Sequence, residues 1–159
     1  MKTLVCLIVL LAAAPGVAKP WQGIVPGQTK RDLLIQKFGE PSRVVTSEGK
    51  ETLAYFDQKA IKGTLQVQFT VDVDTQQVER VNIFPGSVVD KESIESTYGP
   101  GCPTGRVPAT PCYQKKLTDD FRTYLFYPRL GLAVFLNEDG KMVQSLTFTA
   151  PPAGKAKSE

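Results

Sequence analysis

Histidine is absent from this sequence of 159 residues. The chain therefore lacks the commonest general base, the Ser-His-Asp and Cys-His nucleophile arrangements, and the ligand that most transition-metal sites use. No Asp or Glu stands in a recognisable catalytic setting, which disfavours a hydrolase built on carboxylates. We therefore expect a protein that is not an enzyme, has no catalytic residues and binds no cofactor or metal ion.

A large excess of charge of one sign is also missing. The 19 Lys and Arg residues stand against 16 Asp and Glu, which leaves a formal net charge of only +3. Nucleic-acid surfaces carry more concentrated positive charge, so we expect no nucleic-acid partner. With 42% hydrophobic and 22% charged residues, the composition is that of a folded globular domain.

Long apolar runs are limited to one, from Leu4 to Ala14. It follows Lys2 and precedes Pro15-Gly16 and the small residue Ala18, which is the three-part pattern of a secretory signal peptide. The run is too short to span a bilayer, which takes about 20 apolar residues. We expect residues 1–18 to be cleaved off as a signal peptide, and the exported protein to be periplasmic or secreted without a transmembrane segment.

Cysteine is scarce, and one of the three, Cys6, lies within the signal peptide. The cysteines left after processing, Cys102 and Cys112, flank a segment that contains Gly and Pro. In an exported chain two such cysteines predict a disulfide bond that closes the loop between them. A redox or metal-binding pair is the weaker alternative, because CxxC spacing and His ligands are both absent.

An internal repeat organises the rest of the chain. Residues 23–41 and 83–100 share one order of features: an apolar residue, Pro-Gly, a polar cap, a short helix, an aromatic residue, Gly and Pro. In the first copy we expect Thr29 to cap a helix with Leu33, Leu34 and Phe38 on its apolar stripe.

The second copy follows the same plan, with Asp90 as the expected cap. Ile94 and Tyr98 lie four residues apart on the apolar stripe of this helix, and Gly99-Pro100 ends it.

Alternating apolar and polar residues predict antiparallel strands after each helix. The segments are 43–46, 52–56, 65–73 and 78–83 in the first copy and 122–127, 131–136 and 143–148 in the second. We expect an α+β fold of two similar units, residues 20–84 and 85–150. Each is a short helix packed on an antiparallel β-meander, and the two pack together or share one sheet. Residues 151–159 are expected to form a disordered tail.

The first copy resembles a known family. Its run from Gly27 to Pro41 has a capping Thr, an apolar helix and a Gly-x-Pro end, and is similar to the outer-membrane assembly lipoprotein BamE and its SmpA/OmlA relatives. Tandem duplication with a disulfide-closed loop inside one repeat resembles the β-lactamase-inhibitor protein instead. The first resemblance implies a part in envelope or outer-membrane protein assembly, and the second implies enzyme inhibition.

Aromatic residues are concentrated in one strand of the second unit, at 121–127. If Tyr124 and Phe126 face the helix, then Leu125 and Tyr127 face the other way. Exposed tyrosines with arginines nearby are typical of protein-recognition surfaces. The candidate protein-binding residues are Tyr113, Arg122, Leu125, Tyr127 and Arg129. The equally weighted alternative is that these aromatics complete a core shared by the two units.

These features favour a non-catalytic protein-interaction module of the bacterial cell envelope. It would bind another protein through its open sheet face or its disulfide loop, and one role is assistance in envelope or outer-membrane protein assembly. The alternative is a secreted or periplasmic proteinaceous enzyme inhibitor that uses the open sheet face and the loop at 102–112. The sequence names neither the partner nor the oligomeric state.

Overall fold

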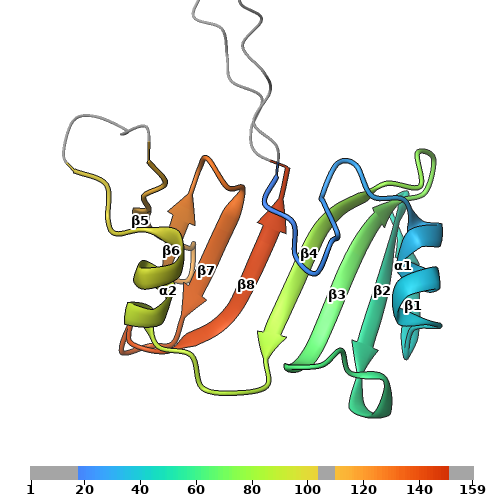
Figure 1. Ribbon diagram of the computed structural model, residues 1–159, viewed down its shortest axis with the longest axis horizontal. Coiled ribbons are helices and arrows are strands. Elements are labelled where there is room, and N and C mark those ends of the chain that lie inside the picture. The colour runs from blue at the N-terminus through green and yellow to red at the C-terminus, as the bar shows by residue number, and fades with distance from the viewer. Residues whose placement is uncertain (1–17, 104–109, 151–159) are drawn as a thin grey trace, which may run out of the picture.

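The computed structural model of the protein describes residues 18–103 and 110–150. Within these residues the first half of the chain forms α1 (Arg31–Phe38), β1 (Arg43–Ser47), β2 (Lys50–Phe56), a 3-10 helix (Asp57–Lys59), β3 (Thr64–Asp72) and β4 (Val78–Pro85) (Figure 1). The second half forms α2 (Lys91–Tyr98), β5 (Gln114–Leu117), β6 (Thr123–Tyr127), β7 (Leu132–Leu136) and β8 (Val143–Thr149). The predicted signal peptide, Ala18 excepted, and the predicted tail lie outside the described residues.

These strands form one antiparallel sheet in the order β1-β2-β3-β4-β8-β7-β6-β5. Each half contributes four consecutive strands, and the halves meet where β4 pairs with β8. The predicted α+β fold, a short helix packed on an antiparallel meander in each half, is confirmed. Of the two arrangements that the sequence left open, the structure shows the single shared sheet. Strand β5 was not predicted, because its sequence Gln-Lys-Lys-Leu lacks the apolar and polar alternation of a half-buried strand.

The two halves are related by an approximate two-fold axis between β4 and β8. Residues Asn82 and Thr147, which are 65 positions apart, pair across this seam, and the Thr147 hydroxyl bonds to Asn82 Oδ1 at 2.9 Å. Both repeats also carry a bulge at the same place, after Thr70 in the β3–β4 pair and after Phe135 in the β7–β8 pair. The duplicated sequence therefore builds two copies of one local structure.

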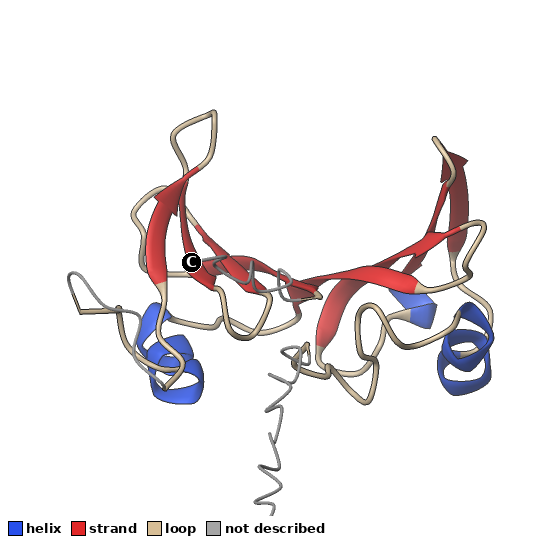
Figure 2. Ribbon diagram, turned by 90° about the horizontal axis from the view of Figure 1, so that it is seen from above, coloured by secondary structure: helices blue, strands red, loops and turns tan. Residues whose placement is uncertain are grey.

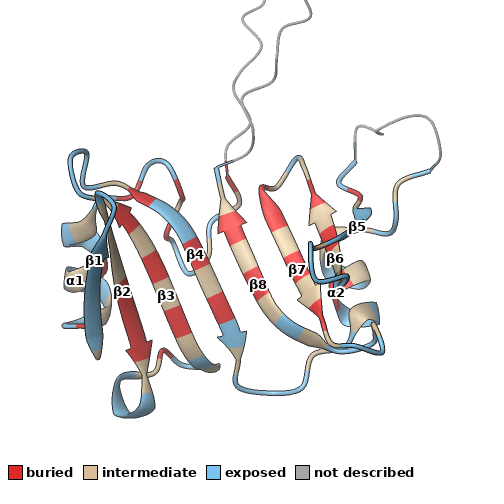
Figure 3. Ribbon diagram, turned by 180° about the vertical axis from the view of Figure 1, so that it is seen from behind, coloured by how far each residue is buried: buried red, intermediate tan, exposed pale blue. Residues whose placement is uncertain are grey.

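Both helices pack on the same face of the sheet, which curves away from them (Figure 2). The apolar core lies between this convex face and the helices. It includes Leu34 of α1 and Ile94 of α2, together with alternate residues of the strands (Figure 3). Within the described residues, no helix is long and apolar enough to cross a membrane.

Helix α1 departs from the predicted cap and stripe. Its N-cap is Lys30, whereas Thr29 is buried and its hydroxyl accepts the Val25 N–H at 2.8 Å. This hydrogen bond closes the turn before the helix and uses the oxygen that was expected to cap it. Leu33 is 53% exposed, because α1 buries only a narrow face centred on Leu34.

Helix α2 begins as predicted, because the Asp90 carboxylate accepts the Ser93 N–H at 2.7 Å. The two helices end in the same way, at Gly39 and Gly99. Each glycine donates its N–H to the carbonyl four residues earlier and has a positive φ, 75° and 108° respectively. A left-handed φ at a helix end favours glycine because it has no Cβ.

These two glycines provide a matched test of the loop that packs against α2. A Cβ at Gly39 would meet nothing within 4 Å, whereas one at Gly99 would overlap the Pro111 carbonyl oxygen. We expect Gly39→Ala to lower the free energy of unfolding by about 1–3 kcal/mol, because its positive φ and extended ψ form a conformation that is nearly restricted to glycine. Gly99→Ala should lower it further, since the loop at Pro111 must also move. Equal shifts of the two denaturation midpoints would contradict the close packing of Pro111 on the helix end.

Candidate functional site

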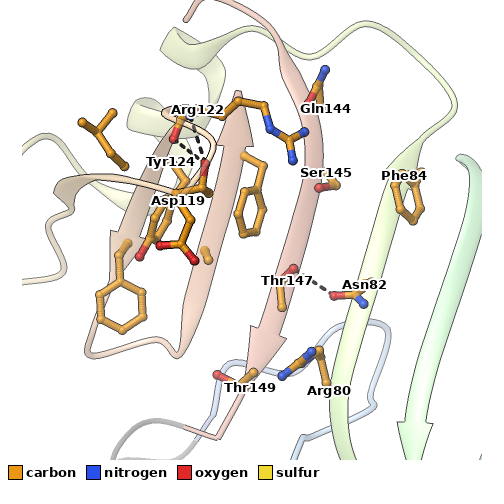
Figure 4. A pocket seen from close by; sticks show the side chains of 15 residues that line it. Arg80, Asn82, Phe84, Asp119, Arg122, Tyr124, Gln144, Ser145, Thr147 and Thr149 are labelled. Carbon is orange, nitrogen blue, oxygen red and sulfur yellow. Dashed lines mark hydrogen bonds between the residues drawn. The ribbon is translucent and has the colours of Figure 1, made fainter. Parts of the chain in front are cut away.

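The concave face of the sheet is the candidate functional site. Within the described residues neither helix covers this face (Figure 2). Over β4, β8, β7 and β6 the face holds a cavity of about 1080 Å³, and Figure 4 shows the side chains that line it. A concave surface with mixed polar and apolar side chains is the usual form of a binding site. The residues that line this cavity include Arg80, Arg122, Tyr124, Phe126, Phe135 and Gln144.

The prediction that Leu125 and Tyr127 lie on this open face is wrong. Both side chains are fully buried in the core on the helix side. The reason lies in the repeat, because Leu125 pairs with Val134 as Leu53 pairs with Phe69 one repeat earlier. Leu125 and Tyr127 are therefore the counterparts of Leu53 and Tyr55, and the neighbours Tyr124 and Phe126 turn to the open face.

Tyr127 has a structural role that mirrors that of Tyr55. The Tyr127 hydroxyl donates to the Gly99 carbonyl at 2.9 Å, and the Tyr55 hydroxyl donates to the Gly39 carbonyl at 2.9 Å. Each tyrosine thus ties the second strand of its repeat to the end of its helix. Burial raises the pKa of Tyr55 to about 12 and raises that of Tyr127 further, so both phenols stay protonated and can donate.

Three aromatic side chains form a cluster on the open face of the second repeat: Tyr124, Phe126 and Phe135. All three are half-buried, and the rings of Tyr124 and Phe135 stack with their centroids 5.2 Å apart. The Lys116 ammonium lies 4.8 Å from the centroid of the Phe126 ring. This aromatic cluster is the apolar part of the cavity wall.

The first repeat has small or polar residues at the equivalent positions. Strand β2 places Thr52 and Ala54 where β6 has Tyr124 and Phe126, and β3 places Thr70 where β7 has Phe135. The core-facing positions of the two repeats are both apolar, but their open faces differ in chemistry. The fold itself therefore does not require aromatic side chains at these three positions.

The structure does not bring the remaining predicted site residues together. Arg122 lines the cavity, whereas Tyr113 lies on the helix side. The centroids of the Tyr113 and Tyr127 rings are 5.6 Å apart, and the Tyr113 hydroxyl donates to the Glu95 carboxylate at 2.6 Å. Burial is the main cause of the raised pKa of Tyr113. Arg129 is exposed in the turn between β6 and β7 and does not line the cavity. The prediction that Tyr113 adjoins the open face is therefore wrong.

The disulfide bond between Cys102 and Cys112 is confirmed, with the two Cα atoms 4.9 Å apart. Two backbone hydrogen bonds hold the base of the loop together: the Cys102 N–H donates to the Tyr113 carbonyl at 2.8 Å, and the Tyr113 N–H donates to the Pro100 carbonyl at 3.0 Å. This base follows α2 and lies on the helix side. Residues 104–109 of the loop lie outside the described residues.

Comparisons with known proteins show the fold and no more. The sequence matches no known family model and no curated protein. The structure is similar to that of a DUF4309 family protein (YjgB) from Bacillus subtilis, with a TM-score of 0.51 and 16% identity over 81% of this chain and 83% of that one.

A second similar structure is an extracellular protein containing a SCP domain from Bacillus anthracis, with a TM-score of 0.52 and 15% identity. The match covers 94% of the present chain but only 49% of that protein, so the chain corresponds to about half of its length. Neither structure belongs to the two families that the sequence resembles, and those resemblances stay predictions.

The described residues contain no group of three or more His, Cys, Asp or Glu side chains that could hold a metal ion. The cavity wall instead combines the aromatic cluster with arginine, hydroxyl and amide side chains. Such a wall can stack on, hydrogen-bond to and attract a ligand. The site that the structure describes is thus suited to binding, and sequence reasoning missed its aromatic half because the wrong alternate residues were assigned to the open face.

Proposed function

We propose that this protein is an exported, non-catalytic binding module that holds another protein on the concave face of its second repeat. The observation that carries the proposal is the difference between the repeats. Tyr124, Phe126 and Phe135 stand on the open face where the equivalent positions have Thr52, Ala54 and Thr70. Because the first repeat folds on the same plan without them, the aromatic residues have a reason other than folding to be there.

Several properties of the surface support a protein as the partner. Protein interfaces are enriched in Tyr, Phe and Arg, and their strongest contacts come from such residues at the centre of a depression. The aromatic cluster lies in a cavity and has Arg80 and Arg122 beside it. Export is supported by the disulfide bond, which is typical of oxidising compartments, together with the predicted signal peptide.

In the cell this binding would serve the assembly of envelope or outer-membrane proteins, as the resemblance to BamE implies. Enzyme inhibition is the second candidate, and the cavity favours it because a concave face can receive a protruding segment of an enzyme. The loop at 102–112 supports inhibition less well, since its base lies on the helix side of the sheet, away from the cavity.

The test is a capture experiment with the mature protein on envelope and culture-medium extracts of the source organism. The key variant, Tyr124→Thr/Phe126→Ala, gives the second repeat the residues that the first has at the same positions, so the fold should be kept. We expect it to retain about tenfold less of the specific partner than the wild type, because the variant lacks the central aromatic contacts. Thr52→Ala, at the matching position of the first repeat, is the control.

Equal retention of every protein by the wild type, the aromatic variant and the control would contradict the proposal. The identity of the captured partner separates the two candidate roles. If it is an enzyme whose activity falls when the wild-type protein is added, inhibition is supported. If it is an envelope or outer-membrane protein without such an effect, the assembly role is supported.

A further inference from the structure

We infer that the partner segment bound by the concave face carries a carboxylate next to an aromatic or large apolar side chain, and that Arg122 binds this carboxylate. The inference rests on the proposed function and names the chemistry of the partner. It follows from a second difference between the repeats, which concerns charge and is independent of the aromatic cluster.

The first repeat neutralises the cation at the start of its second strand. The ammonium of Lys50 lies 2.7 Å from Asp72 at the end of β3 and 2.7 Å from Glu79 on β4. The hydrogen bond from Lys50 is the main reason why the pKa of Asp72 lies well below its usual value. Two acidic residues on neighbouring strands thus balance the charge of one lysine.

The second repeat keeps the cation and has neither acid. Extending the β6–β7 register by two residues places Arg122 opposite Asn137, as Lys50 stands opposite Asp72 in the first repeat. Glu79 sits in the β4 bulge, and Gln144 occupies the corresponding bulge position in β8. Both carboxylates are therefore replaced by neutral amides, which can hydrogen-bond but carry no charge.

What remains near Arg122 is a weak ion pair within its own loop. Its Nε donates to Asp120 at 2.7 Å, and the two side chains are 52% and 60% exposed. Ion pairs this exposed to water contribute little to stability. A ligand carboxylate can therefore displace Asp120 from Arg122, or bind Arg122 beside it, at a small cost in free energy. Among the described residues, no protein acceptor is hydrogen-bonded to the terminal Nη atoms of Arg122.

The charges around the aromatic cluster are mixed, with a positive excess on the sheet itself. Arg80 lines the cavity and forms no ion pair with any of the described residues. Lys116 lies over Phe126, and the acids Asp119 and Asp120 stand together on the loop before β6. The charged residues that line the cavity are the cations Arg80 and Arg122 and one acid, Asp119, so a ligand carboxylate would meet a wall of net positive charge.

The chemistry of arginine favours a carboxylate as the ligand group. Its planar guanidinium presents paired N–H groups that match the two oxygens of a carboxylate, and such bonds are stronger than neutral ones. With Tyr124 and Phe135 beside it, the site offers one place for a negative group and one for a flat apolar group. An extended segment in which Asp or Glu alternates with aromatic residues fits both.

The experiment uses the mature protein and three labelled synthetic peptides in which Phe alternates with Glu, Gln or Lys. Fluorescence anisotropy at low salt should show that the Glu peptide binds about tenfold more tightly than the Gln peptide, with the Lys peptide weakest. Arg122→Gln should remove the advantage of the Glu peptide, whereas Lys50→Gln, at the matched position of the first repeat, should keep it. Added salt should reduce the advantage, because screening weakens attraction between exposed charges.

Equal affinity for the Glu and Gln peptides, or equal effects of Arg122→Gln and Lys50→Gln, would overturn the inference. So would a failure of all three peptides to bind. The proposed function is tested separately by Tyr124→Thr/Phe126→Ala in the capture experiment. If that variant loses the partner while the peptides show no preference for Glu, the concave face still binds a protein but the assigned chemistry of the partner is wrong.

Discussion

Replacing Tyr127 with Ala should lower the free energy of unfolding by about 3–5 kcal/mol, as large-to-small substitutions of buried aromatic residues do. The side chain is fully buried, packs against Tyr98 and Tyr113 and donates its hydroxyl to the Gly99 carbonyl. Its removal leaves a cavity where β6, α2 and the disulfide loop meet. Thermal unfolding followed by circular dichroism should show a decrease in Tm of roughly 10–20 °C.

Two control variants separate the parts of this effect. Tyr127→Phe keeps the ring and removes only the hydrogen bond to Gly99, which should cost about 1 kcal/mol. Tyr124→Ala removes a half-buried ring from the open face, next in sequence to the core-facing Leu125. This variant should lower the free energy of unfolding by less than about 1 kcal/mol. If Tyr127→Ala unfolds at the wild-type temperature, Tyr127 cannot be the core residue that the structure describes.

The duplication, the helices and most strands could be predicted because they depend on local signals. Pro-Gly turns, Gly-x-Pro ends and strict alternation, as in Leu65–Phe69, each specify structure over a few residues. Strand β6 lacks such a signal. Every residue from Tyr124 to Tyr127 is aromatic or apolar. Apolar and polar residues therefore do not alternate there, and the sequence does not show which side chains face the core and which face the open side.

The repeat contained the information that alternation could not supply. The first unit has Leu53-Ala-Tyr55 and the second has Leu125-Phe-Tyr127, so matching the two Leu-x-Tyr triplets gives the correct phase. The charge difference in the candidate site needed more than sequence. Asp72 and Asn137, like Glu79 and Gln144, keep the 65-residue offset of the repeat, but only the strand register shows that both acids of the first repeat reach Lys50.

The disulfide bond should provide the second large contribution to stability. Replacing both Cys102 and Cys112 with Ala should lower the free energy of unfolding by just under about 3 kcal/mol, because the unfolded chain gains the conformational freedom that the closed loop denies it. Denaturant unfolding of the variant and of the reduced wild type should give the same lower midpoint. Oxidised wild-type protein should yield the linked pair in non-reducing peptide mapping, and two freely alkylated thiols in protein from its native compartment would contradict the bond.

The same variant also tests whether the loop contacts the partner. The base of the loop packs on the helix side through Tyr113, whereas the cavity is on the concave face. Below its melting temperature, Cys102→Ala/Cys112→Ala should therefore capture the partner as well as the wild type does, although it is less stable. If capture is lost while circular dichroism shows the folded sheet, the loop is part of the binding surface. That result would favour the inhibitor role, in which the open face and the loop at 102–112 act together.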